Sequence, residues 1–286
     1  MKFQATLTHQ NTLAKRLGRS LRLGLLSSIA CLCFCQSLYA RAATECGQFN
    51  LAFYELGALY YKNPQGNYSG IDKDVIEELS RRTGCQFQTS LESRVRIWAQ
   101  LSSNALDMSV SGIATAEREK FAYFIPYFAT RNYVLLQSYL ATSSHTMAGF
   151  LNDPNLKVAI VKSFKHGANY DEWLAKLRQQ NRLIEAADFD SVMRLFLAKR
   201  VDAMLALATS LEPLKRRESP PHFIVLDWSP SDYLPHGLVI SRSRVPASVV
   251  ELFKLHIRQM QEDGSLEQIF TQHVGPELAK AMRLKN

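Results

Sequence analysis

Short apolar runs alternate along the chain with segments in which apolar residues recur at helical spacing. In the first half, this pattern predicts strands at 49–54, 85–91 and 106–111 and helices at 71–83 and 94–103. Asp72 near the start of the first helix and Gly84 just past its end are typical helix boundaries. The second helix is expected to bury Val95, Trp98 and Leu101. Strand, helix, strand, helix and strand at this spacing predict parallel pairing with right-handed crossovers.

The alternation begins afresh in the second half, after an extended run at 132–138 and a loop at 139–154. The expected elements are strands at 157–161, 182–186, 201–207 and 223–226, and helices at 167–180, 189–198 and 209–217. An extended segment at 237–241 and two amphipathic helices follow. Two open α/β units joined by 132–138 and by 237–241 predict a bilobal protein with a closing cleft between the carboxyl edges of its sheets.

The stretch DMSVSGIATAEREKFAYFIPYF, residues 107–128, is the strongest candidate for a ligand contact. A short buried strand runs into a polar loop at 111–117, and Arg118 follows directly. Small and hydroxylated residues at the end of a strand present backbone N–H groups to an anion, and an arginine adds a fixed positive fork. Arg118 is therefore expected to contact a ligand. The alternative is that residues 117–120 form a solvated charge run at a helix start.

The first 42 residues are expected to lie outside the fold. Basic residues precede an apolar run from Leu23 to about Ala40, and Ala40-Arg41-Ala42 has the small-x-small pattern of a cleavage site. This arrangement predicts a secretory signal peptide and a periplasmic protein. A membrane anchor is an alternative, although serines and a glutamine interrupt the apolar run. A lipid-anchored Cys31 is another, although Ser28 stands where an aliphatic residue is wanted.

Removing this segment changes the charge argument. The whole chain has 34 Lys and Arg against 26 Asp and Glu, and residues 1–42 hold six basic and no acidic residues. The remaining chain therefore has 28 basic against 26 acidic residues, a net charge of +2. A high isoelectric point would have suggested nucleic acid, but near neutrality we expect no nucleic-acid partner.

Only Cys46 and Cys85 remain after the same cut. Both precede predicted strands, and the starts of neighbouring parallel strands lie side by side, so we predict one disulfide between them. Two buried free thiols are the alternative. No metal site is expected, because neither cysteine belongs to a CxxC motif and the histidines are scattered. No cofactor is expected either.

Several motifs resemble those of the family 3 periplasmic solute-binding proteins. The segment YSGIDKDVIEELSRRTG, residues 68–84, is similar to their "G-(F/I)-D-x-D-(L/V)" helix. The stretch from Leu106 through Thr115-Ala-Glu-Arg118 to Pro126-Tyr127 looks like their strand, "T-P-E-R" loop and "PY" segment. Arg200-Val-Asp-Ala and Asp263-Gly264 resemble two further signatures. Together these motifs run across essentially all of the chain after residue 42.

This resemblance implies a periplasmic-binding-protein fold, with lobe 1 at 43–134 plus 241–286, lobe 2 at 135–240, and hinge strands at the edges of lobe 2. It implies a monomeric receptor that captures a small polar solute, most often an amino acid, for an inner-membrane ABC permease. In the family, the arginine that Arg118 matches grips the ligand's carboxylate. The other ligand-binding residues implied by the family's positions are Ser111, Thr115, Tyr54, Glu55, Ser163, Phe164 and His166.

The sequence also departs from the family pattern. The loop before Arg118 is one residue shorter than usual, and Ala116 replaces the usual proline. Arg94 falls where the family often has a stacking aromatic; it is a candidate second cation for the ligand or a surface arginine at a helix start. The carboxylate that holds an α-ammonium in relatives is replaced at or near Leu207. Either Glu55 takes over the amine, or the ligand is not a plain α-amino acid.

Three classes of function remain open: a solute receptor, an enzyme on the same scaffold such as a dehydratase, and a regulatory or structural partner-binding protein. The cleft segments contain no Ser-His-Asp or Cys-His arrangement and no carboxylate pair that spacing singles out. We therefore predict a binding protein without catalytic residues, specific for an anionic or carboxylate-bearing solute.

Overall fold

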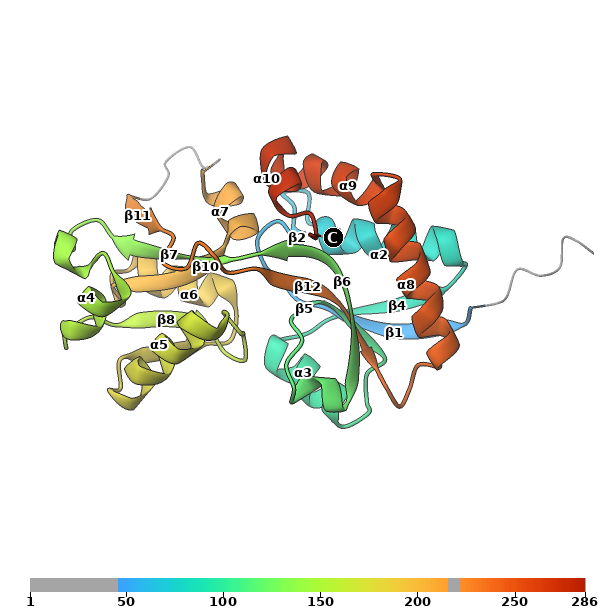
Figure 1. The fold of residues 1–286 in the computed structure, drawn as a ribbon, viewed down its shortest axis with the longest axis horizontal. Coiled ribbons are helices and arrows are strands. Elements are labelled where there is room, and N and C mark those ends of the chain that lie inside the picture. Colours follow the sequence, from blue (N-terminus) through green and yellow to red (C-terminus); the bar gives the residue numbers. More distant parts are fainter. Residues whose placement is uncertain (1–45, 216–221, 286) are drawn as a thin grey trace, which may run out of the picture. The chain divides into compact units, whose positions relative to one another are not determined.

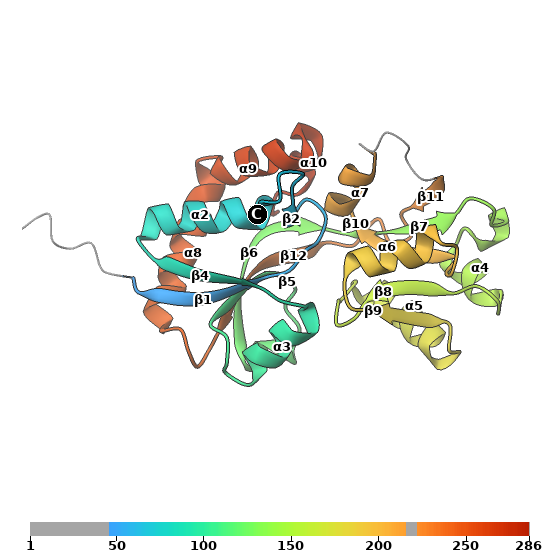
Figure 2. The ribbon, with the colours of Figure 1, turned by 180° about the vertical axis from the view of Figure 1, so that it is seen from behind.

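The computed structural model describes residues 46–215 and 222–285. The predicted signal peptide, with Cys31, Cys33 and Cys35, lies outside the described residues, as does the end of the helix predicted at 209–217. Within the described ranges, no helix has the length and apolar character needed to cross a membrane. Figures 1 and 2 show the fold from opposite sides.

The first of two five-stranded sheets is formed by both ends of the described chain. Across the sheet, its strands are β4 (Gln86–Leu91), β1 (Gln48–Phe53), β5 (Met108–Gly112), β12 (Leu234–Ser241) and β6 (Ala122–Thr130). β1 pairs in parallel with β4 and β5, which confirms the predicted parallel pairing. β12 is antiparallel to both β5 and β6. Pro126 lies on the edge strand β6, where a missing N–H is tolerated.

Helices cover both faces of this sheet. α2 (Ile71–Thr83), α8 (Ala247–Glu262), α9 (Ser265–Val274) and α10 (Pro276–Ala281) lie on one side, and α3 (Arg94–Ser102) lies on the other (Figures 1 and 2). Gly84 ends α2 in the left-handed conformation, as its position predicted. In α3, Ile97 and Leu101 are buried but Val95 is exposed, so its predicted burial is wrong. Positions 94, 97 and 101 share the inward face, and position 95 lies beside it.

The second sheet is contiguous in sequence. Its strands, in order, are β11 (Phe223–Leu226), β7 (Asn132–Gln137), β10 (Ala203–Leu207), β8 (Val158–Val161) and β9 (Leu183–Ala186). Its helices are α4 (Met147–Asn152), α5 (Ala168–Gln179), α6 (Phe189–Leu197) and α7 (Ala208–Lys215). α5 buries the four residues expected from its spacing, Tyr170, Trp173, Leu174 and Leu177. This sheet has its own apolar core.

The chain passes between the sheets twice, at Arg131 between β6 and β7 and again between Leu226 and Leu234. β12 pairs along its whole length with β6, so residues 235–240, expected in the second lobe, lie in the first sheet. The connection between β1 and α2 contains a small hairpin formed by β2 (Tyr61–Lys62) and β3 (Tyr68–Ser69).

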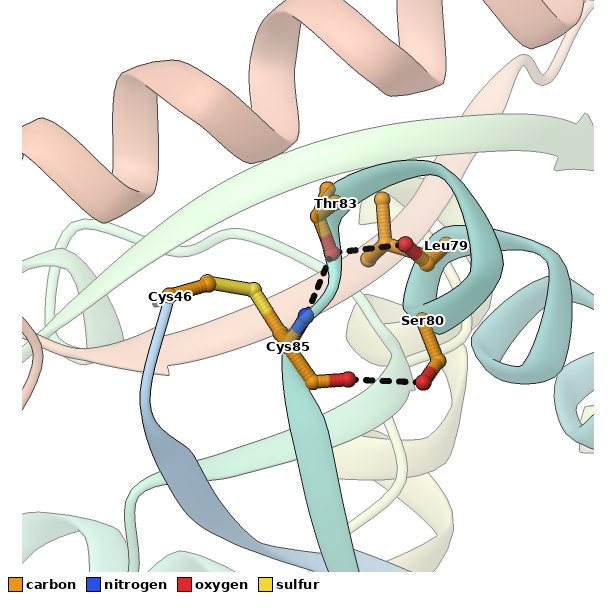
Figure 3. Close-up of a disulfide and its surroundings, with 5 residues drawn as sticks. All are labelled: Cys46, Leu79, Ser80, Thr83 and Cys85. Carbon is orange, nitrogen blue, oxygen red and sulfur yellow. Dashed lines mark hydrogen bonds between the residues drawn. A yellow bond between two sulfur atoms is a disulfide. The ribbon is translucent and has the colours of Figure 1, made fainter. Parts of the chain in front are cut away.

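Cys46 and Cys85 form the predicted disulfide, with their Cα atoms 4.7 Å apart (Figure 3). The bridge follows from the parallel register of β1 and β4, in which Gln48 is paired with Gln86. Hydrogen bonds hold the turn after α2 beside it: Ser80 Oγ donates to the Cys85 carbonyl at 2.6 Å, and the Cys85 N–H donates to Thr83 Oγ1 at 3.2 Å.

Candidate functional site

The last two residues of β5 and the loop that follows, residues 111–118, are together called the first loop, and a buried carboxylate holds the start of this segment. Ser111 has φ 48° and turns its hydroxyl inward, where Oγ donates to Asp72 Oδ1 at 2.7 Å and Oδ2 at 2.9 Å. Tyr127 OH donates to Asp72 Oδ1 at 2.5 Å. Desolvation raises the pKa of Asp72 to about 7 despite these bonds. The hydroxyl of Ser111 is thus occupied within the protein.

Arg94 lies beneath the same loop, at the first position of α3. Its guanidinium donates to the carbonyls of Val110 and Ser111, each at 3.3 Å, and lies 4.1 Å from the centre of the Tyr54 ring. Only 5% of Arg94 is exposed, so the interpretation as a surface arginine is wrong. Burial lowers the pKa of Arg94 below that of an ordinary arginine.

Arg118 begins a short 3-10 turn, Arg118–Lys120. Its guanidinium stacks on Trp98, 3.7 Å from the ring centre, and donates at 2.9 Å to the Ile113 carbonyl and at 2.9 Å to the Ser163 carbonyl. Thr115 Oγ1 accepts from the Arg118 N–H at 3.3 Å. Burial, followed by the charge of Arg94, lowers the pKa of Arg118 to about 10. Arg118 is buried while its neighbours in the charge run are exposed, so the solvated-run interpretation fails for this residue.

The loop after β8, residues 162–167, is called the second loop, and it supplies the carbonyl that Arg118 contacts. Ser163 has φ 67°, and the Phe164 ring packs edge-on against Tyr54 with ring centres 5.9 Å apart. His166 is buried, and its Nδ1 lies 3.0 Å from Asn132 Oδ1. The His166 N–H donates to Asp171 Oδ1 at 3.1 Å, so at least this expected anion-binding group has a protein partner.

These groups surround a cavity of about 20 Å³, which is room for roughly one water. Six of the predicted site residues line it: Tyr54, Arg94, Ser111, Arg118, Ser163 and Phe164. Leu207, at or near the position where the family resemblance implies a carboxylate, lines it as well. Among the residues that the structure describes, those lining this cavity include Arg94, Arg118 and Lys165 but no Asp or Glu. The lining is therefore suited to an anion.

Three predicted residues are not part of this lining: Thr115, Glu55 and His166. Glu55 is exposed and lines two larger cavities beside Asp188, of about 420 and 630 Å³. Burial, with Asp190 and Asp188 nearby, raises the pKa of Glu55 above that of an ordinary glutamate. Sequence reasoning missed His236, Asn132 and Asp72. Only Asp72 carried a signal, since it belongs to the helix motif at 68–84.

A bilobal fold with an arginine-lined cavity between two α/β sheets defines a solute-binding protein. A model of the bacterial extracellular solute-binding proteins, family 3, matches residues 57–276. The protein belongs to this family, as its motifs predicted. The family is typically periplasmic or extracellular, which agrees with the predicted location at that coarse level. None of the curated proteins compared with the chain matches it.

Solved structures with the same fold have low sequence identity to the chain. An ancestral arginine-binding protein bound to glutamine is 17% identical with a TM-score of 0.68, covering 80% of this chain and 98% of its own. AncCDT-1, an ancestral amino acid-binding protein described as a precursor of cyclohexadienyl dehydratase, is 19% identical with a TM-score of 0.64, covering 80% and 95%. A putative L-cystine ABC transporter from Listeria monocytogenes is 14% identical with a TM-score of 0.65, covering 81% and 97%. At these identities, the likeness supports the bilobal fold alone.

Proposed function

We propose that the protein is a periplasmic, monomeric receptor that binds a small carboxylate-bearing solute between its two sheets and delivers it to an ABC permease of the inner membrane. The observation that carries this proposal is the pairing of Arg94 and Arg118 at a cavity whose described lining has no acidic residue. Two desolvated guanidinium groups strongly favour a bound anion.

Arg118 is the group we assign to the carboxylate. Its fork donates to two neutral main-chain carbonyls, those of Ile113 and Ser163. A carboxylate accepts two parallel N–H bonds from one guanidinium, and such charge-assisted bonds are stronger than bonds to neutral oxygens. A solute carboxylate that displaces the Ser163 carbonyl therefore replaces a bond to a neutral oxygen with a stronger, charge-assisted bond.

Solute entry requires the sheets to separate, because the cavity of about 20 Å³ is too small for an organic solute. The Arg118–Ser163 bond joins the sheets across the cavity and must break. We propose hinge motion about Arg131 and the segment between Leu226 and Leu234, with solute shifting the population of states. An unchanged radius of gyration at saturating solute, measured by small-angle scattering, would contradict this motion.

Substitution of Arg118 tests the carboxylate assignment. Arg118→Ala should weaken binding by roughly 2–5 kcal/mol, as for loss of one partner of a desolvated charge pair. Arg118→Lys should also fail, because it keeps the charge but loses the fork. Calorimetry against a panel of carboxylates, sugars and polyamines measures both, with the exposed Lys120→Ala as the matched control. Tight binding of a neutral sugar that neither Arg118 variant affects would refute the assignment.

A dehydratase-like enzyme is the second candidate, because one solved relative is described as a precursor of cyclohexadienyl dehydratase. Catalysis needs a proton donor or acceptor at the substrate. The described cavity lining offers His236 and cationic side chains but no carboxylate. Product analysis after incubation with each bound carboxylate distinguishes the candidates, since a receptor returns the solute unchanged.

A further inference from the structure

His236 is a histidine buried within an otherwise apolar stretch of β12, an interior strand of the first sheet. It is 4% exposed, and its ring stacks on Phe128 of β6, with centres 4.9 Å apart and planes inclined by 16°. The register of β12 against β6 shifts directly after it, between His236 and Gly237. Such irregularities commonly re-aim a side chain, and the His236 side chain lines the arginine cavity.

The neighbours of the ring determine which nitrogen carries the proton. His236 Nδ1 lies 3.4 Å from the Ser111 carbonyl, which also accepts from Arg94 at 3.3 Å and from Tyr54 OH at 3.2 Å. A carbonyl oxygen only accepts, so Nδ1 is the protonated nitrogen. Nε2 of the neutral ring is then a lone-pair acceptor. It is buried and has no hydrogen-bond partner among the described residues.

The ring stays neutral in this environment. Burial, together with the charge of Arg94, lowers the pKa of His236 to about 3. His166 repeats the pattern, with Nδ1 facing Asn132 Oδ1 and a buried Nε2 that has no partner in the described part of the chain, but it does not line the cavity. His236 therefore adds an uncharged acceptor to a cavity that is otherwise rich in cationic donors.

The acceptor and a cation lie within reach of one small ligand. His236 on β12 and Arg94 on α3 contact the same oxygen, the Ser111 carbonyl. His236 lines the same small cavity as both arginines, so a ligand whose carboxylate binds the arginines shares that cavity with Nε2. An α-ammonium there would be desolvated next to two guanidinium groups, and the described lining of the cavity holds no carboxylate to pair with it. A hydroxyl would satisfy Nε2 without that repulsion.

We propose that His236 Nε2 accepts a hydrogen bond from an uncharged donor on the carbon next to the ligand's carboxylate, and that the preferred ligand is a 2-hydroxycarboxylate rather than a 2-amino acid. This proposal rests on the carboxylate-receptor function proposed above and narrows its ligand class. It assigns His236 as a specificity-determining residue.

Ligands that share one carbon skeleton provide the test. We would measure calorimetric affinities of the full folded protein for 2-hydroxy-, 2-oxo- and 2-amino-4-methylpentanoate and for the three-carbon analogues. The 2-hydroxy acid should bind roughly 10-fold more tightly than the 2-oxo acid, the scale of one buried hydrogen bond. The 2-amino acid should bind most weakly.

His236→Phe should erase the preference for hydroxy over oxo acid and leave affinity for the oxo acid within about threefold, because a phenyl ring can keep the stack on Phe128 but accepts no hydrogen bond. His236→Gln, whose amide oxygen accepts, should retain part of the preference and serves if the Phe variant does not fold. Tighter binding of the amino acid, or an unchanged preference in both folded variants, would overturn the proposal. If the oxo acid binds in a way that depends on Arg118 but the hydroxy acid binds no more tightly, the His236 proposal is overturned and the carboxylate-receptor proposal stands. If no carboxylate binds, both proposals fail.

Discussion

The two loops that meet at the Arg118–Ser163 bond differ in the groups that hold each of them. In the first loop, the Ser111 hydroxyl is bonded to Asp72, its carbonyl accepts from three donors, and Thr115 Oγ1 caps the Arg118 N–H. In the second loop, Ser163 offers its carbonyl to Arg118, and His166 is bonded to Asn132 and Asp171 but keeps a ring nitrogen with no hydrogen-bond partner among the described residues. We infer that the first sheet carries a prearranged half-site and that the second supplies the half that adjusts when solute enters.

The largest expected difference between the halves lies in how stability depends on pH. The pKa of Asp72 is raised from 3.8 to about 7 in the folded protein, so its contribution is complete below pH 4 and is lost as pH rises to 7. The pKa of His166 is lowered from 6.5 to about 3, so its contribution is present above pH 6.5 and is lost as pH falls toward 3. Each full effect is on the order of 4–5 kcal/mol, at about 1.4 kcal/mol per pKa unit.

Urea unfolding of Asp72→Asn and His166→Gln between pH 4 and 7 measures both effects. Subtracting each variant's free energy of unfolding from that of the parent protein should give opposite slopes, falling with pH for Asp72 and rising for His166. Slopes of the same sign would show that Asp72 and His166 do not respond to pH in opposite directions. Glu77→Ala, on the exposed face of α2, is the control for loss of a surface carboxylate.

Removing the Cys46–Cys85 disulfide tests whether the first loop is held only by its own neighbours or also by this distant cross-link. The disulfide joins the starts of β1 and β4, whereas the first loop lies at the end of β5, a strand parallel to β1. Replacing both cysteines with alanine should lower the free energy of unfolding by roughly 2–4 kcal/mol. Carboxylate affinity at a temperature where the variant is folded should stay within about threefold. A large loss of affinity with the fold intact would mean that the disulfide contributes to the arrangement of the first loop.

The smallest expected effects come from a matched pair of glycine substitutions. Ser111 and Ser163 both have positive φ, but only Ser111 uses its hydroxyl to bind a buried carboxylate. Ser163→Gly should change stability by at most about 1 kcal/mol, in the stabilising direction, because glycine removes left-handed strain. Ser111→Gly should destabilise by about 1–3 kcal/mol, because Asp72 loses a buried donor. Equal effects in thermal unfolding would contradict the contrast between the loops.

Local signals in the sequence predicted much of this structure. Apolar spacing and Gly84 located α2, the parallel strand starts predicted the disulfide, and the motif at 107–128 led to Arg118. The pairing of segments that are distant in the chain left no such signal in the sequence. The placement of 237–241 and the burial of Val95 depended on which neighbour each segment meets.

Within the site, the sequence predicted residue types better than their partners. The sequence indicated Asp72 only as a residue typical of a helix start. Nothing in the sequence indicated that Ser111 and Tyr127 would enclose its carboxylate. His236 is a lone histidine in an apolar strand, a pattern more typical of an ordinary core residue. Its relevance depends on the Ser111 carbonyl, 125 positions away.

The position of β12 has a consequence for the order in which the chain folds. β12 lies between β5 and β6, so those two strands have no partner on their facing edges until residues 234–241 arrive. The second sheet needs only residues from Asn132 to Leu226 and is complete in sequence before β12 emerges. Such non-local pairing slows folding. A chain made from its N-terminus therefore assembles the adjustable half first, and the half-site that holds Arg118 is finished last.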